Sequence, residues 1–184
     1  SCDGILFCKK GQSSDSEDKI VYAELSGYTR ARTDSYYAVP ATFDVKIGEP
    51  ESAVENETWK VTVIGRRVMY GAKFSELVIP SSVEKIEAYG IYLNSNLYKI
   101  TFLEAADGET AANLVMGEKA IYYNEWLTKL ILPTRLKDFD VNQIVYCNNL
   151  VDVTFAGEGG DYLAKENMVC TDNGATLIWV PQGI

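Results

Sequence analysis

The sequence predicts a β-rich α/β repeat solenoid, a right-handed stack of coils with a parallel sheet, short helical returns between the strands, and a β-hairpin cap at each end. Three observations lead to this prediction. An apolar triplet recurs with constant internal spacing, the segments after the triplets agree position by position, and both ends carry hairpin patterns. We expect one continuous domain, with an N-terminal β cap over residues 1–58, repeat coils over 59–156, and a C-terminal coil and hairpin cap over 157–184.

The triplet has a spacing of three and then two residues. Its four copies are Phe74, Leu77 and Ile79; Leu97, Ile100 and Phe102; Leu127, Leu130 and Leu132; and Leu150, Val153 and Phe155. The copies start 23, 30 and 23 residues apart, so one interval holds seven extra residues. We place this insertion in residues 103–113, where Gly, Asp and small residues are typical of a surface loop. A single coil cannot bury its apolar face, so we expect triplet to stack over triplet, as in a leucine-rich repeat.

The segments between the triplets repeat as well. After Pro80 and after Pro133, apolar or small residues occupy the same offsets of 3, 6, 11 and 14 residues. Return segments such as AYGIYLN and KAIYYNE hold apolar residues three and four apart, which predicts short helical turns. Asn94, Asn124 and Cys147 share a position near the end of the return, where we expect small polar side chains to satisfy inward-facing backbone groups.

Both ends are predicted to close the stack, because open ends would expose strand edges. At the N-terminus, GILFCKK and KIVYAELSGY flank the polar run GQSSDSED as a hairpin, and YAVPATFDVKI adds a strand. At the C-terminus, two apolar runs flank Asp172, Asn173 and Gly174, a strong turn signal. We expect Leu177, Ile178 and Val180 to lie against the strand that contains Val153.

Composition argues against several functions. The net charge of −9, with scattered Lys and Arg residues, disfavours nucleic acid and anionic lipid as partners. The sequence has no histidine, so the commonest catalytic base is missing. No CxxC spacing indicates zinc, and the acidic loop SSDSEDK lacks the ligand alternation of an EF-hand. We therefore predict no enzyme, no metal and no cofactor. Membrane contact is expected only if Cys2 carries a lipid anchor.

The repeat unit resembles the BspA-like class of leucine-rich repeats, found in bacterial secreted and surface proteins. Its pattern is approximately L-x-x-I-x-I-P-x-x-V-x-x-I-G-x-x-A-F-x-x-C-x-x-L, and LVIPSSVEKIEAYGIYLNSNLYKITF follows it nearly throughout. Glu87 and Asp140 depart from it at the glycine position. The resemblance implies export with removal of a signal peptide, and an extracellular or cell-surface location. It also implies binding of proteins or host matrix rather than catalysis.

Together these features predict a non-catalytic extracellular or cell-surface module for protein binding or adhesion. Its expected partner is a protein, such as a host matrix or surface protein. Two alternatives remain open at this stage. The chain could be a structural spacer or surface-layer component, or it could be a glycan-binding accessory protein.

Two sets of residues are candidate binding sites. The first comprises outward-facing strand positions, namely Glu76, Lys99, Thr101, Lys129, Ile131 and Asp152. In register, Glu76 faces Lys99 and Lys129 faces Asp152. A sheet surface of purely structural importance explains this set, and we favour that interpretation.

The second set is a recurring series of tyrosines, from which we select Tyr92, Tyr122 and Tyr123, with Tyr70 and Tyr146 at related positions. Tyrosine is common at interfaces, because its side chain has an apolar ring and a polar hydroxyl group that can face water. Packing of the rings over the coil edges explains the periodicity too, and we favour it. Exposure of five or more of the rings together would favour an interface instead.

Overall fold

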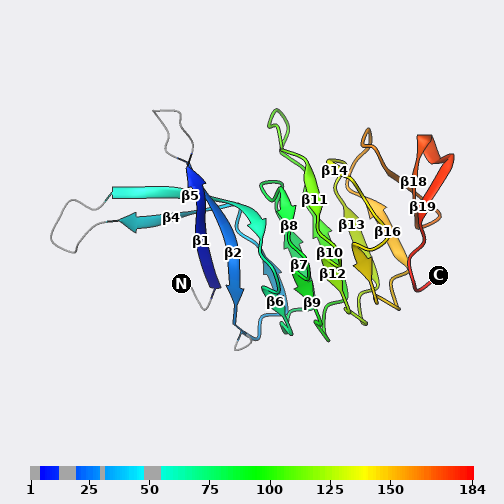
Figure 1. Cartoon of the computed structure of the whole chain (residues 1–184), viewed down its shortest axis with the longest axis horizontal. Helices are drawn as coiled ribbons and strands as arrows, with labels where there is room; N and C mark the ends of the chain where they lie inside the picture. The colour runs from blue at the N-terminus through cyan, green and yellow to red at the C-terminus, as the bar shows by residue number, and fades with distance from the viewer. Residues whose placement is uncertain (1–4, 13–19, 30–31, 48–54) are drawn as a thin grey trace.

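The structure is a computed structural model that describes residues 5–12, 20–29, 32–47 and 55–184. Cys2 and the whole acidic loop SSDSEDK, residues 13–19, lie outside the described residues, so the predictions made for them stay predictions. Figure 1 shows an elongated stack with the N-terminal cap at one end and the C-terminal hairpin at the other. Within the described ranges, no helix is long and apolar enough to cross a membrane.

Each coil runs around three sides, and each side belongs to a different sheet, in which the strands of successive coils pair in parallel. The triplets form the first sheet, which we call the triplet sheet, in the order β16-β13-β10-β7-β3. Its strands are β3 (Tyr36–Ala38), β7 (Glu76–Ile79), β10 (Lys99–Phe102), β13 (Lys129–Leu132) and β16 (Asp152–Phe155). The predicted parallel sheet is therefore confirmed, and Pro80 and Pro133 directly follow the ends of β7 and β13.

The other two sides are built from very short strands. One side, the tyrosine sheet, comprises β6 (Met69–Tyr70), β9 (Ile91–Tyr92), β12 (Ile121–Tyr122) and β15 (Ile144–Val145). The last side comprises β8 (Lys85–Ile86), β11 (Leu114–Met116) and β14 (Leu136–Lys137), which continue the sheet of the N-terminal cap. Figure 1 shows these strands repeating along the stack.

The predicted helical returns are wrong. Among the described residues, the only helix is a 3₁₀ turn, η1 (Asp172–Gly174), in the C-terminal cap. The returns consist instead of short strands joined by tight corners, at which residues such as Tyr89, Leu93, Lys119 and Tyr123 adopt φ angles of 60°, 54°, 55° and 55°. Left-handed residues of this kind interrupt a helix. The apolar spacing of three and four residues thus reflects the corners of a coil.

The core is a continuous stack of apolar side chains. Leu77, Ile100, Leu130 and Val153 are in register across the triplet sheet and are fully buried. Each such side chain stabilises the fold by roughly 1.5–3 kcal/mol relative to an exposed position. The placement of one triplet over the next is as the sequence predicted.

A ladder of side-chain amides runs beside this core and satisfies buried backbone groups. Asn94 Oδ1 accepts from the backbone N–H of Ala72 at 2.7 Å, and its Nδ2 donates to the Met69 carbonyl at 2.9 Å. One coil further on, Asn124 Oδ1 accepts from the backbone N–H of Asn94 at 3.0 Å, and its Nδ2 donates to the Ile91 carbonyl at 3.0 Å. The predicted role of the two asparagines is confirmed.

The C-terminal cap completes the amide ladder. Cys147 is the last residue of the series, and its sulfur accepts a hydrogen bond from the backbone of Asn124. The backbone N–H of Cys147 donates in turn to Gln182 Oε1 of the cap, at 2.9 Å. Gln182 thus supplies the acceptor that the asparagine of a further coil would supply.

The N-terminal cap contains the predicted hairpin. Strands β1 (Ile5–Gln12) and β2 (Val21–Tyr28) pair antiparallel, and β2 pairs in parallel with β5 (Glu55–Ile64). Strand β4 (Thr42–Ile47) pairs antiparallel with β5. Because β5 also pairs with β8 of the first coil, it spans the predicted boundary at residue 58 and joins the cap to the stack.

The C-terminal cap is a three-stranded antiparallel sheet of β17 (Leu163–Lys165), β18 (Met168–Thr171) and β19 (Thr176–Trp179). The expectation that Leu177 and Val180 lie against the strand of Val153 is wrong, because both are exposed, whereas Ile178 is partly buried and packs against the core. A register shift between β18 and β19 leaves Ile178 without an opposing residue and turns Trp179 inward, where it is 6% exposed. The bulge changes which side chains face the core.

Residues 103–113, here called the insertion loop, follow β10 as predicted and contain no helix or strand. The buried Arg135 holds the end of this loop. Its guanidinium donates to the carbonyls of Val83 at 2.7 Å and Ala112 at 3.0 Å, which joins the loop to two neighbouring coils. Burial lowers the pKa of Arg135.

Candidate functional site

The outward face of the triplet sheet carries the predicted ion pairs. Lys99 Nζ lies 3.2 Å from Glu76 Oε2, and Lys129 Nζ lies 2.7 Å from Asp152 Oδ2. Thr101 and Ile131 are adjacent in the next row and half-buried. The hydroxyl of Tyr98 donates to Glu76 at 2.5 Å, and this bond together with Lys99 lowers the pKa of Glu76. The charges on this face therefore satisfy one another.

The tyrosines form a continuous group, which we call the tyrosine array. Its members are Tyr70, Tyr89, Tyr92, Tyr122, Tyr123 and Tyr146. Along the tyrosine sheet, the ring centroids of Tyr70 and Tyr92 are 5.2 Å apart, and those of Tyr92 and Tyr122 are 5.4 Å apart. Register across the parallel strands places one ring over the next.

The array is partly exposed. Tyr70, Tyr123 and Tyr146 are 37%, 39% and 46% exposed, whereas Tyr92 and Tyr122 are half-buried. Burial, with a smaller contribution from Tyr146, raises the pKa of Tyr122. Three exposed rings fall short of the five that would favour an interface over packing, and the rings both cover the coils and face solvent.

Three cationic groups lie close to the ring of Tyr89. The sequence did not point to Tyr89 as a site residue. The guanidinium carbons of Arg66 and Arg67 lie 5.8 and 5.5 Å from its ring centroid, and Lys119 Nζ lies at 6.0 Å. Distances of this order allow cation–π attraction. Tyr89 belongs to a corner with positive φ rather than to a strand, so the triplet pattern gave no sign of it.

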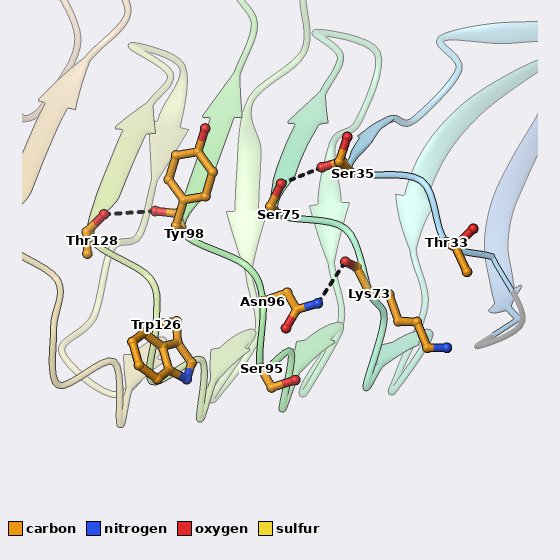
Figure 2. A pocket seen from close by; sticks show the side chains of 9 residues that line it. All are labelled: Thr33, Ser35, Lys73, Ser75, Ser95, Asn96, Tyr98, Trp126 and Thr128. Atoms are coloured by element: carbon orange, nitrogen blue, oxygen red, sulfur yellow. Dashed lines mark hydrogen bonds between the residues drawn. The ribbon is translucent and has the colours of Figure 1, made fainter.

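A shallow groove runs along the corner where the coils enter the triplet sheet. It has a volume of about 780 Å³. Figure 2 shows its nine lining residues, which come from the N-terminal cap and from three successive coils: Thr33, Ser35, Lys73, Ser75, Ser95, Asn96, Tyr98, Trp126 and Thr128. The sequence did not predict this groove.

Hydrogen bonds between successive coils position the groove side chains. The hydroxyl of Ser75 donates to the Ser35 carbonyl at 2.7 Å, and that of Thr128 donates to the Tyr98 carbonyl at 3.2 Å (Figure 2). Asn96 Nδ2 donates to the Lys73 carbonyl at 3.2 Å. Since the same backbone positions recur in each coil, the polar side chains form rows along the stack.

Two aromatic residues stand out at the groove. Trp126 is 63% exposed, and Tyr98 is 42% exposed. Trp126 also lines a smaller hollow of about 60 Å³ together with Tyr123, so the groove adjoins the tyrosine array.

Among the residues described, no group of His, Cys, Asp and Glu side chains is arranged to hold a metal. Burial raises the pKa of the Cys147 thiol to about 12, which keeps the sulfur protonated and poorly reactive at neutral pH. The arrangement is suited to contact and hydrogen bonding.

Comparison with solved structures establishes the fold. Over 98% of this chain, the structure matches the pneumococcal vaccine antigen PcpA, with a TM-score of 0.55 and 14% sequence identity. The chain has the leucine-rich repeat fold. A leucine-rich cell surface protein from Faecalibacterium prausnitzii also matches over 95% of the chain, with 14% identity and a TM-score of 0.37.

The leucine-rich repeat chain spans 56% of the PcpA chain and 62% of the Faecalibacterium chain. No family model matches its sequence, and no curated protein matches it.

Proposed function

We propose that this chain is a non-catalytic, BspA-like leucine-rich repeat module on the outside of a bacterial cell, where it binds another protein and contributes to adhesion. The tyrosine array is the observation on which the proposal rests. The leucine-rich repeat fold, shared with a pneumococcal antigen, supports the surface location.

The array has the properties of a protein contact surface. Tyrosine side chains supply a large contact area with few rotatable bonds, so their ordering costs little entropy on binding. The register of the parallel strands places the rings of Tyr70, Tyr92 and Tyr122 in one row before any partner arrives. Because Arg66 and Arg67 lie beside Tyr89, a partner segment with acidic side chains beside apolar ones fits this surface best.

A binding assay with immobilised host-matrix proteins tests the proposal. The purified chain is passed over collagen, laminin and fibronectin, and a Tyr123→Ser, Tyr146→Ser double variant is compared with it. We expect saturable capture of the parent on at least one surface and at least tenfold weaker capture of the variant, since tyrosine is typical of interface hot spots.

Tyr36→Ser provides the matched control, because Tyr36 is an exposed tyrosine outside the array. Capture of this control should equal that of the parent. No capture of the parent on any surface, or equal loss in both variants, would argue against the array as a protein contact.

A further inference from the structure

The groove in Figure 2 follows the long direction of the stack and has the dimensions of a ligand site. Its lining residues precede four neighbouring strands of the triplet sheet, β3, β7, β10 and β13. Neighbouring strands lie about 4.8 Å apart, so four strands extend over about 14 Å. The volume of about 780 Å³ lies within the range of small-molecule sites, roughly 300–1,000 Å³. A short linear oligomer fits this shape better than a compact metabolite.

The polar groups of the groove are held in place before a ligand arrives. When Ser75 and Thr128 donate their hydroxyl hydrogens to backbone carbonyls, their oxygen lone pairs remain able to accept. Asn96 uses one of its two amide hydrogens for the Lys73 carbonyl, and the side-chain amide has a second. The groove therefore offers a fixed row of acceptors and donors without net acidic character.

An aromatic side chain accompanies this polar row. Trp126 lines the groove at its end and presents most of its surface to solvent. An exposed indole attracts flat, weakly polar surfaces such as the C–H face of a sugar ring, while adjacent hydroxyl and amide groups bond to the hydroxyls at the ring edge.

Two other classes of ligand fit the groove less well. An extended peptide would need free backbone groups, but the N–H groups of Ser75, Tyr98 and Thr128 all donate to the preceding coil. An anionic polymer would meet only Lys73 as a cation among the lining residues, on a chain of net charge −9.

We infer that the groove is a binding site for a neutral oligosaccharide, with Trp126 stacking on a sugar ring and Ser75, Asn96 and Thr128 bonding to its hydroxyls. The site is separate from the protein contact proposed for the tyrosine array. One chain thus carries a glycan site and a protein site on adjoining sides of its coils.

Isothermal titration calorimetry on the whole chain tests this inference. The probes are neutral hexasaccharides of glucose, mannose and N-acetylglucosamine, with a sulfated hexasaccharide as the charged probe. We expect saturable heat with at least one neutral probe, and binding roughly tenfold weaker or worse for Trp126→Ala, since the stacking surface is lost. Because Trp126 is largely exposed, this variant should unfold at the same temperature as the parent.

Tyr146→Ser is the control for this site, and its sugar binding should match that of the parent. Conversely, Trp126→Ala should be captured normally by matrix proteins, so failure of one proposal leaves the other standing. The inference is overturned by absence of heat with every neutral probe at millimolar concentration. Equal affinity of Trp126→Ala, or binding of the sulfated probe alone, overturns it as well.

Discussion

Replacement of Asn124 by alanine should strongly destabilise the fold, because this side chain joins two coils from inside the core. Asn124 Oδ1 accepts from both the backbone N–H and the Nδ2 of Asn94, at 3.0 and 3.1 Å, and Asn124 Nδ2 donates to the Ile91 carbonyl at 3.0 Å. Alanine removes all three bonds in a place that water does not reach.

The loss leaves at least two buried backbone groups, the N–H of Asn94 and the carbonyl of Ile91, without these partners. Each buried group left unsatisfied costs about 1–3 kcal/mol, so we expect the free energy of unfolding of Asn124→Ala to fall by about 2–6 kcal/mol. Domains of this kind have only about 5–15 kcal/mol in total. The variant should therefore be close to unfolding.

Urea unfolding followed by circular dichroism measures this change, with Asn148→Ala as an exposed control that should alter stability by less than about 0.5 kcal/mol. Asn124→Cys gives a second measurement if the alanine variant fails to fold. It should lose less stability, because Cys147 already occupies the equivalent place in the next coil. A loss for Asn124→Ala no larger than that of Asn148→Ala would refute this account of the ladder.

Three further predictions concern other parts of the molecule. Arg135→Met should leave carbonyl groups unpaired and loosen the insertion loop. Limited proteolysis should then cut that loop faster than in the parent. An unchanged rate would contradict the role of Arg135 in holding the loop. Tyr98→Phe should raise the pKa of Glu76 toward its ordinary value, as measured by NMR titration of the carboxyl carbon. The pKa of Glu76 is depressed in the folded state, so the stability from the Tyr98–Glu76 bond is present above the pKa of the unfolded chain. This stability is lost as pH falls through the pKa of the folded state. The stabilities of the parent and Tyr98→Phe should therefore differ least in strong acid. Iodoacetamide at neutral pH should modify the exposed Cys8 much faster than the buried Cys147, and equal rates would show that the ladder opens readily.

The stacked strands were predictable because their signal is local. In a strand, side chains alternate between faces, so the last two apolar residues of each triplet mark the buried side, and alignment of triplet with triplet then sets the register. The pairing of Glu76 with Lys99 followed from that register alone. The asparagine positions were predictable for the same reason, since a small polar residue repeated inside an apolar coil requires a backbone partner.

The corners and the groove were not predictable in this way. Apolar residues three and four apart occur both in helices and at the corners of a coil. Here Tyr89, Leu93 and Lys119 occupy left-handed positions where glycine would have been the usual signal. Ser75 and Trp126 lie outside the strands, at positions where the residue type changes from coil to coil. These positions form one groove only when the coils are stacked. The bulge that buries Trp179 likewise depends on strand pairing.

Gln182 accepts a hydrogen bond from the backbone N–H of Cys147, and this bond affects how many coils such a fold can contain. Gln182 accepts from the last coil in the same way as the asparagine of another coil would. The C-terminal cap could therefore close a stack of five coils as well as one of four. Duplication of one coil in the gene would then leave the C-terminal cap unchanged. The number of coils could vary without further mutations in the cap.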